Sequence, residues 1–233
     1  MEFTRLSGES EAYLDARDQL RLAEIELMQQ RERVAEMRRA LPAGAVVEDY
    51  EFLEGPRALD EGDTPVARVR LSELFSAPDR PLVVYHLMYG KAQTSPCVMC
   101  TQWIDGINGI AHHLARNVDF VVVAAADPPA LRAHGRAREW NRLRLLSCGD
   151  NTFKFDLRSE EADGSQDSTV SVFTRDADGN VRHTYTARPT MAPDIPERGI
   201  DLLCATWNLL DLTPNGRGDW YSSLDYGLST TPS

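Results

Sequence analysis

Apolar residues follow a regular spacing along the first forty residues of the chain. From Glu11 to Leu41 they recur in alternating steps of three and four, with one break at Gln30. This is the spacing of a coiled-coil seam of about four heptads. Ser10 suits a helix N-cap and Pro42 ends the pattern. We therefore expect a long amphipathic helix whose seam is formed by Tyr13, Ala16, Leu20, Ala23, Leu27, Val34, Met37 and Leu41.

Two interpretations of this helix stay open. It packs on its own domain, or it is an arm that pairs with a second copy of the chain. A helix of thirty residues extends about 45 Å, which is longer than a small domain needs. We expect a homodimer through Tyr13, Leu20, Leu27, Val34 and Met37.

A different pattern begins at residue 82. The apolar, β-rich runs Leu82–Tyr89 and Val118–Ala126 predict buried strands. Between them, Cys100–Arg116 has apolar residues on one helical face, and Pro128–Trp140 predicts a second helix that Asp127 caps. Strands joined through a helix are expected to be parallel, with a right-handed crossover.

The later part of the chain predicts antiparallel structure. Thr169–Thr174 and Val181–Ala187 flank a turn of the sequence DADGN, which is typical of a hairpin, and Ile200–Leu212 predicts a closing helix. The order β-α-β-α followed by β-β-α is that of thioredoxin. We therefore expect an α/β fold, a thioredoxin-like mixed sheet flanked by helices, with a long N-terminal helix.

These elements suggest three parts of the chain. Residues 1–42 form the N-terminal amphipathic helix, residues 43–214 the thioredoxin-like domain, and residues 215–233 an irregular C-terminal tail.

Charge and length narrow the classes of function. The 233 residues carry a formal net charge of −11, and a field of that sign repels phosphate backbones, so we expect no nucleic-acid partner. The apolar runs are too short to span a bilayer, and the start of the chain lacks a secretory signal pattern. We expect a cytoplasmic protein with free thiols and no membrane partner. The sequence has no phosphate-binding glycine-rich loop, and no cofactor is expected.

The sequence Cys97-Val98-Met99-Cys100 is the strongest chemical signal. It follows a predicted strand and opens a predicted helix. Backbone N–H groups and the dipole at a helix N-terminus stabilise a thiolate, which is the form that attacks disulfides and peroxides. A second cysteine three residues later can resolve the mixed disulfide. Cys97 would therefore attack and Cys100 would resolve.

Other interpretations of these residues remain. A zinc or copper site would normally need a second close pair of ligands, and Cys148 and Cys204 stand alone. We therefore expect no metal. His86, in the strand that leads to the motif, is either a catalytic residue that exchanges protons with a thiol or a hydrogen-bonded core histidine. If the strand is regular, Tyr85 and Tyr89 point to the opposite face from His86.

Several segments resemble a bacterial thioredoxin-like family of unknown function, the DUF899 type, which is similar to peroxiredoxins of the alkyl-hydroperoxide-reductase kind. They are LVVYHLMY at residues 82–89, CVMC at 97–100, SCG at 147–149, and GIDLL at 199–203 with WNLLDLTP at 207–214. The resemblance implies the thioredoxin-like fold and a protein disulfide, thiol or peroxide as substrate.

The sequence departs from active relatives of this fold at one position. Thioredoxin-like oxidoreductases typically place a cis-proline before the strand that faces the cysteines, and the chain has no proline near Ser168. Our leading hypothesis is a thiol–disulfide oxidoreductase or thiol peroxidase. The alternatives are a non-catalytic binding protein on the same fold, which the missing proline favours, and a metal site on the two cysteines.

Overall fold

The structure, a computed structural model, describes residues 5–193 and 198–225. The chain divides into two compact units, Met1–Ala43 and Gly44–Ser233. The first unit contains helix α1 (Glu11–Arg39), and the second contains every strand and every other helix of the described residues.

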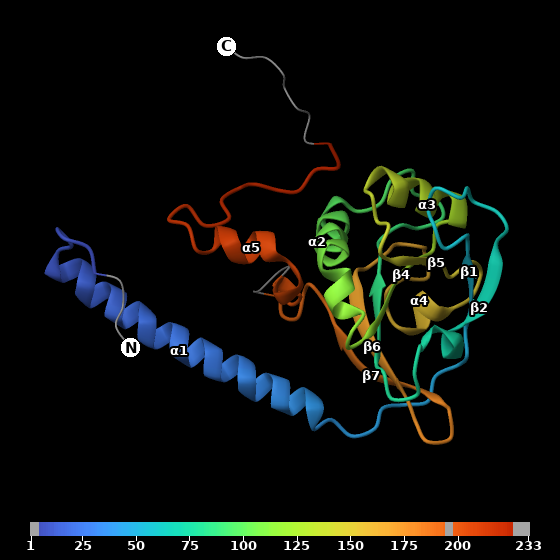
Figure 1. Cartoon of the computed structure of the whole chain (residues 1–233), viewed down its shortest axis with the longest axis horizontal. Coiled ribbons are helices and arrows are strands. Elements are labelled where there is room, and N and C mark those ends of the chain that lie inside the picture. The colour runs from blue at the N-terminus through green and yellow to red at the C-terminus, as the bar shows by residue number, and fades with distance from the viewer. Residues whose placement is uncertain (1–4, 194–197, 226–233) are drawn as a thin grey trace, which may run out of the picture. The chain divides into compact units, whose positions relative to one another are not determined.

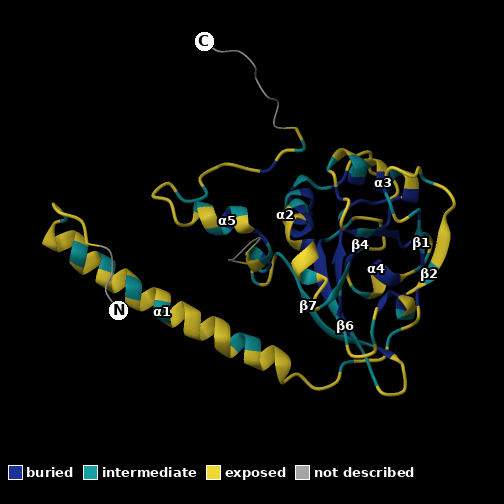
Figure 2. Ribbon diagram, viewed as in Figure 1, coloured by how far each residue is buried: buried dark blue, intermediate teal, exposed yellow. Residues whose placement is uncertain are grey.

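Helix α1 begins where the sequence predicts and ends two residues early. The Ser10 hydroxyl accepts a hydrogen bond from the N–H of Tyr13 at 3.2 Å, which satisfies one of the free donors of the first turn. No residue of α1 is buried, and Figure 2 shows the helix as exposed or intermediate along its length. The predicted seam is therefore open: Leu20 is 59% exposed and Met37 is 68% exposed.

The second unit is built on one mixed sheet of seven strands (Figure 1). Their order across the sheet is β2-β1-β5-β4-β3-β6-β7. The strands are β1 (Glu51–Glu54), β2 (Ala67–Arg70), β3 (Leu82–His86), β4 (Asp119–Ala124), β5 (Arg144–Ser147), β6 (Thr169–Arg175) and β7 (Val181–Ala187).

The central strands have the expected thioredoxin topology. β3 and β4 are parallel, β3 and β6 are antiparallel, and β6 and β7 form the predicted hairpin. The helices of this unit are α2 (Val98–Leu114), α3 (Pro128–Ala137), α4 (Phe153–Asp156), α5 (Ala205–Leu210) and the 3₁₀ helices η1 (Leu71–Leu74) and η2 (Asp201–Leu203). The predicted fold class is confirmed.

Each face of the sheet has its own core. One face packs against α2 and α3 and the other against η1 and α4. Side chains alternate along β3, so Tyr85 belongs to the α2 face, whereas Val84 and His86 belong to the α4 face. The predicted separation of Tyr85 from His86 is confirmed.

Two helix predictions need correction. The helix predicted to reach Trp140 ends at Ala137, because Glu139 adopts a left-handed conformation with φ 56°. The single helix predicted from Ile200 to Leu212 is interrupted at Cys204, whose backbone is extended. The Asn208 amide donates to the Cys204 carbonyl at 2.7 Å and takes the place of a helical N–H.

Sequence analysis did not find α4, which has only four residues. The Asn151 side chain accepts a hydrogen bond from the Phe153 N–H at 3.0 Å at the start of this turn. Phe153 is fully buried and packs edge-on against Phe52. Tertiary packing, more than local propensity, therefore accounts for this turn.

Candidate active site

The two cysteines lie where the chain passes from β3 into α2. The loop that joins β3 to α2 folds back on itself. Cys97, at the end of this loop, donates its backbone N–H to the carbonyl of Met88, near the start of the loop, at 3.0 Å. Cys97 is the N-cap of α2, and its Sγ accepts a hydrogen bond from the Cys100 N–H at 3.5 Å. The structure therefore places the Cys97 sulfur at the positive end of a 17-residue helix.

The two thiols differ in their access to solvent. Cys97 is half-buried, whereas Cys100 is fully buried on the α2 face of the sheet. Burial, followed by the hydrogen bond with Cys97, raises the pKa of the Cys100 thiol well above its usual value. The Cys97 thiol is therefore partly open to solvent, and the buried Cys100 thiol is held protonated.

Tyr85 is a site residue that the sequence analysis did not assign. Its side chain is fully buried on the α2 face. Among the described residues its hydroxyl has no hydrogen-bond partner of good geometry, yet it lies beside the side chains of Cys100 and Ser168. Burial and then the charge of Cys100 raise the pKa of Tyr85 well above its usual value. Tyr85 is therefore a neutral O–H donor next to the buried thiol.

Ser168 lies directly before β6, at the position where thioredoxin-like oxidoreductases typically have a cis-proline. Its side chain is buried, with 2% exposure, and it faces the Tyr85 hydroxyl. The Cys100 thiol, the Tyr85 hydroxyl and the Ser168 hydroxyl thus follow one another at the end of the sheet.

His86 lies on the other face, apart from Cys97. Its ring stacks on Phe153 at 5.2 Å between centroids, and its Nε2 is 3.0 Å from the Ser171 hydroxyl. Burial, followed by the charge of Lys154, lowers the pKa of His86 well below its usual value, so the ring is neutral. The structure therefore brings Cys97 and Cys100 together and does not bring His86 to them.

Lys154 is the second residue that the sequence analysis did not assign. It extends from α4 to the end of β3, where its Nζ donates to the Leu87 carbonyl at 2.8 Å. Burial lowers the pKa of Lys154 to about 8 and raises the pKa of Cys148, which directly follows β5, to about 11. Both side chains lie at the carboxyl ends of the parallel strands, the same edge at which α2 begins.

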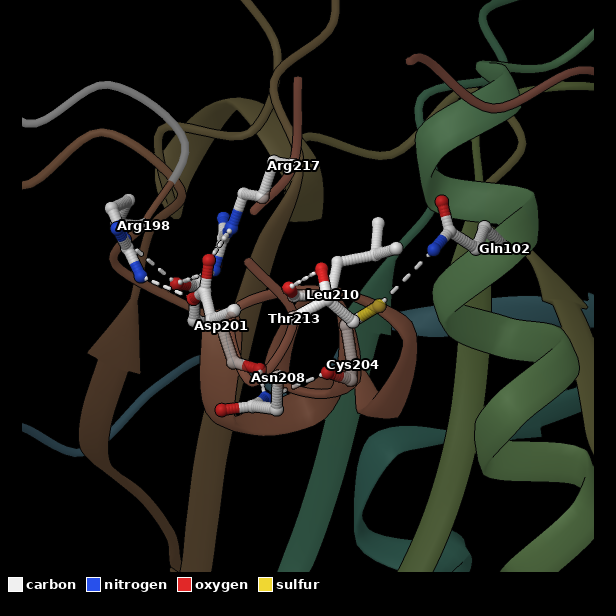
Figure 3. Close-up of polar contacts among 9 residues, drawn as sticks. Gln102, Arg198, Asp201, Cys204, Asn208, Leu210, Thr213 and Arg217 are labelled. Carbon is white, nitrogen blue, oxygen red and sulfur yellow. Dashed lines mark hydrogen bonds and ion pairs between the residues drawn. The ribbon is translucent and has the colours of Figure 1, made fainter. Parts of the chain in front are cut away.

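The C-terminal segment of the described chain packs against the first turns of α2. The side-chain amide of Gln102 donates to the Cys204 sulfur at 3.2 Å, as Figure 3 shows. The side-chain oxygen of Gln102 accepts a hydrogen bond from the Ser222 hydroxyl. The Ser222 hydroxyl also lies 3.7 Å from the Met99 sulfur. One glutamine of α2 therefore holds two parts of the C-terminal segment.

Four charged residues stabilise this segment internally (Figure 3). Arg217 binds the carboxylates of both Asp201 and Asp211 at 2.7 Å, and Arg198 binds Asp201 at 3.0 Å. The Arg217 guanidinium also lies over the Trp207 ring, 5.1 Å from its centroid. Arg217 is thus engaged within the fold.

Other kinds of site were sought over the described residues. In residues 5–193 and 198–225, no three His, Cys, Asp or Glu side chains are grouped so that they could hold a metal ion. No helix in these ranges is both long and apolar enough to cross a membrane. A cavity of about 360 Å³, lined in part by Phe75, Asp119 and Arg142, lies at the opposite ends of the strands from Cys97.

The sequence model for "Bacterial protein of unknown function (DUF899)" matches residues 4–227, which is nearly the whole chain. The chain belongs to the DUF899 family. The resemblance stated from the sequence is therefore confirmed. Among curated proteins, none matches the chain.

Solved structures with a similar fold share little sequence with this DUF899 protein. Reduced Prx3 with H₂O₂ from Vibrio vulnificus is 18% identical, with a TM-score of 0.47, over 70% of this chain and 97% of its own. Mycobacterium tuberculosis AhpC is 14% identical, with a TM-score of 0.46, over 70% and 94%. Peroxidoxin BcpB from Mycobacterium tuberculosis is 17% identical, with a TM-score of 0.46, over 73% and 98%.

Proposed function

We propose that this protein is a two-cysteine thiol oxidoreductase, in which Cys97 attacks a peroxide or a disulfide and Cys100 resolves the product. One observation supports this most. A half-buried Cys97 lies at the N-cap of α2, and the backbone N–H of the buried Cys100 donates to the sulfur of Cys97. Such a thiolate is stabilised by the helix end and can reach a substrate. Free thiols suit a reducing compartment, and we propose the cytoplasm.

The proposed chemistry balances without a cofactor. With a peroxide, the Cys97 thiolate takes the terminal oxygen, the O–O bond breaks, and an alcohol or water leaves with a proton. Cys100 then attacks the sulfenic acid, the S–O bond breaks, and water leaves as the disulfide forms. With a disulfide substrate, the Cys97 thiolate attacks one sulfur, the substrate S–S bond breaks, and the first substrate thiolate leaves. Cys100 then attacks Cys97 in the mixed disulfide, and the second substrate thiolate leaves as the 97–100 disulfide forms. The proposal routes no proton through His86, because its neutral ring lies on the other face.

A redox titration tests the proposal. The purified protein is equilibrated in mixtures of reduced and oxidised dithiothreitol, quenched with acid, tagged with an alkylating reagent and mapped by mass spectrometry. We expect a two-electron transition confined to Cys97 and Cys100. Thiols that stay free across the whole series would contradict the proposal.

The same experiment separates the alternatives. Thiols that become reactive only after a chelator is added would indicate metal on Cys97 and Cys100. Partner binding that survives replacement of both cysteines would support a binding protein on this fold, as the absence of a proline at Ser168 suggests.

Tyr85→Phe removes one hydroxyl next to the resolving thiol. We expect the step in which Cys100 closes the disulfide to slow about tenfold, because the thiolate of Cys100 loses a neighbouring O–H donor. Rapid acid quench, with the mass of the intermediate as readout, measures this step.

Tyr89→Phe is the matched control for this prediction. Tyr89 is buried on the same face of the sheet as Tyr85 and belongs to the same core. We expect its resolution rate to stay at the wild-type value. A Tyr85→Phe protein that resolves as fast as Tyr89→Phe would remove Tyr85 from the proposed site.

We also propose that the protein is a homodimer through the exposed seam of α1. Leu20 and Leu27 are each more than half exposed in the single chain, and water-exposed heptad positions are stabilised by pairing with a second helix. We expect sedimentation equilibrium to give twice the chain mass at micromolar concentration. The double variant Leu20→Asp, Leu27→Asp should be monomeric, whereas the off-seam double variant Leu22→Asp, Gln29→Asp should stay dimeric; a monomeric wild type would contradict the proposal.

A further inference from the structure

Lys154 places an amine in the interior of the protein, and no residue of the described chain forms an ion pair with it. It is one of two lysines in the chain, and its side chain is fully buried. The Leu87 carbonyl accepts one of its hydrogen bonds, and no carboxylate in the described ranges lies at ion-pair distance from it. A buried ammonium is costly unless another charge compensates it. A negatively charged group near the Lys154 ammonium is therefore expected.

Several titratable groups lie around Lys154, and they include one member of the Cys97–Cys100 pair. The groups whose charges act on it are, largest first, Cys148 after β5, Cys100 on α2, and Glu160 and Asp167 before β6, with His86 beside it on β3. The thiol of Cys148 is neutral at pH ~7, because burial raises its pKa to about 11. Asp167 is already paired with Arg188 at 2.8 Å, and His86 is neutral. With a pKa of about 8, Lys154 is mostly protonated at neutral pH.

Lys154 also touches the backbone that presents the two cysteines. The Leu87 carbonyl accepts both the Lys154 ammonium and the Tyr89 N–H at 2.8 Å. The next carbonyl, that of Met88, accepts the Cys97 N–H. The hydrogen bond of Lys154 and the one that fixes Cys97 are therefore made to the carbonyls of consecutive residues.

We infer that Lys154 is a positioning residue whose counter-charge is the thiolate of the reduced Cys97–Cys100 pair, and that it favours the reduced form of this centre. The inference rests on the proposed redox function. Reduction breaks the S–S bond and adds two electrons and one proton, which leaves one thiol and one thiolate; dithiothreitol supplies the electrons and closes into its own cyclic disulfide. A positive charge nearby stabilises only the side of this equilibrium that holds the thiolate.

The test compares two variants that each remove one lysine charge. Lys154→Met should lower the equilibrium constant for reduction by dithiothreitol about tenfold at pH ~7, which corresponds to about 30 mV. At pH ~9.5 the wild-type Lys154 is itself deprotonated, so the difference should fall below about twofold. Lys91→Met removes the exposed lysine that pairs with Asp150, and it should match the wild type at both pH values.

The pH dependence separates an electrostatic role from a packing role. A loss of packing alone would change the equilibrium constant equally at both pH values, and that result would overturn the inference. Equal constants for the wild type and Lys154→Met at pH ~7 would also overturn it. A wild type without any 97–100 transition would instead contradict the proposed function, and the two failures are distinct.

A second measurement needs no variant at the buried site. Protein labelled with ¹³C-lysine gives signals from two residues only, and Lys91→Met assigns them. Coupling between two sites is reciprocal, so we expect the pKa of Lys154 to be higher in the reduced protein than in the oxidised protein. Identical values in the two redox states would overturn the inference.

Discussion

Cys97→Ser is expected to reduce the rate of peroxide or disulfide reduction by at least about a hundredfold, because a serine hydroxyl stays protonated where a thiolate forms. The helix end at which Cys97 lies cannot ionise a hydroxyl, whose intrinsic acidity is many orders of magnitude weaker than that of a thiol. The side chains are similar in size, so the fold should be retained. Peroxide consumption with dithiothreitol as electron donor measures the rate, and circular dichroism checks the fold.

The other cysteines make this prediction specific. Cys100→Ser should keep the first attack and accumulate a Cys97 adduct that a mass spectrum identifies, because the resolving sulfur is absent. Cys204→Ser should keep most of the wild-type rate, since Cys204 contacts Gln102 on a different side of α2 from the Cys97 N-cap. A Cys97→Ser protein that works at the wild-type rate would rule out the proposed chemistry.

Arg132→Met is expected to lower the free energy of unfolding by about 3–5 kcal/mol, the range seen when a buried charged group loses its network. The Arg132 side chain is 3% exposed and donates to the carbonyls of Pro56 at 2.6 Å and Ala58 at 3.0 Å. It also donates to the carbonyl of Gly62 at 2.5 Å. Each carbonyl that loses its donor in the interior costs about 1 kcal/mol or more.

The lost ion pair contributes less than the lost backbone contacts. Asp63 keeps Arg136, which binds its carboxylate at 2.7 Å, so it is not left without a cation in the variant. The Ala58 carbonyl keeps the Glu61 N–H at 3.4 Å, whereas the carbonyls of Pro56 and Gly62 have no second donor in the part of the chain that the structure describes. Urea unfolding should show a lower midpoint with an unchanged slope. Arg142→Met is the control, because Arg142 is exposed, and it should change the free energy of unfolding by less than about 0.5 kcal/mol; equal losses in the two variants would contradict this account.

The sequence was sufficient for the part of the fold in which local pattern and tertiary packing agree. The runs around Val84 and Val122 are apolar, β-branched and short, and both are central strands. The position of the cysteines at a helix start followed from the change of period near residue 97. The Ile200–Leu212 region failed because its helical spacing could not reveal the extended backbone of Cys204 or the side-chain hydrogen bonds of Asn208.

Tyr85 and Lys154 were not predicted as residues of the candidate site, because their interest depends on which groups lie beside them in the folded chain. Tyr85 has the ordinary appearance of a strand aromatic, and only the folded chain places its hydroxyl beside Cys100. Lys154 offered one usable signal: it stands between Phe153 and Phe155 in a chain where nearly every other cation is an arginine. Arginine cannot release its proton at accessible pH, whereas a buried lysine can. The lysine at position 154 therefore differs chemically from the arginines that supply nearly all the other positive charges of the chain.

The attachment of the C-terminal segment to α2 has a consequence for biosynthesis. Gln102 is made long before Ser222, yet the two side chains are bonded in the finished protein. At about 5–20 residues per second, roughly 6–24 s separate their synthesis on the ribosome. During that interval the nascent chain already contains both cysteines, while the segment that will cover Met99 does not yet exist. Met99, which lies between the two cysteines, therefore lacks its Ser222 contact until translation nears its end, and slow codons late in the message would lengthen that interval.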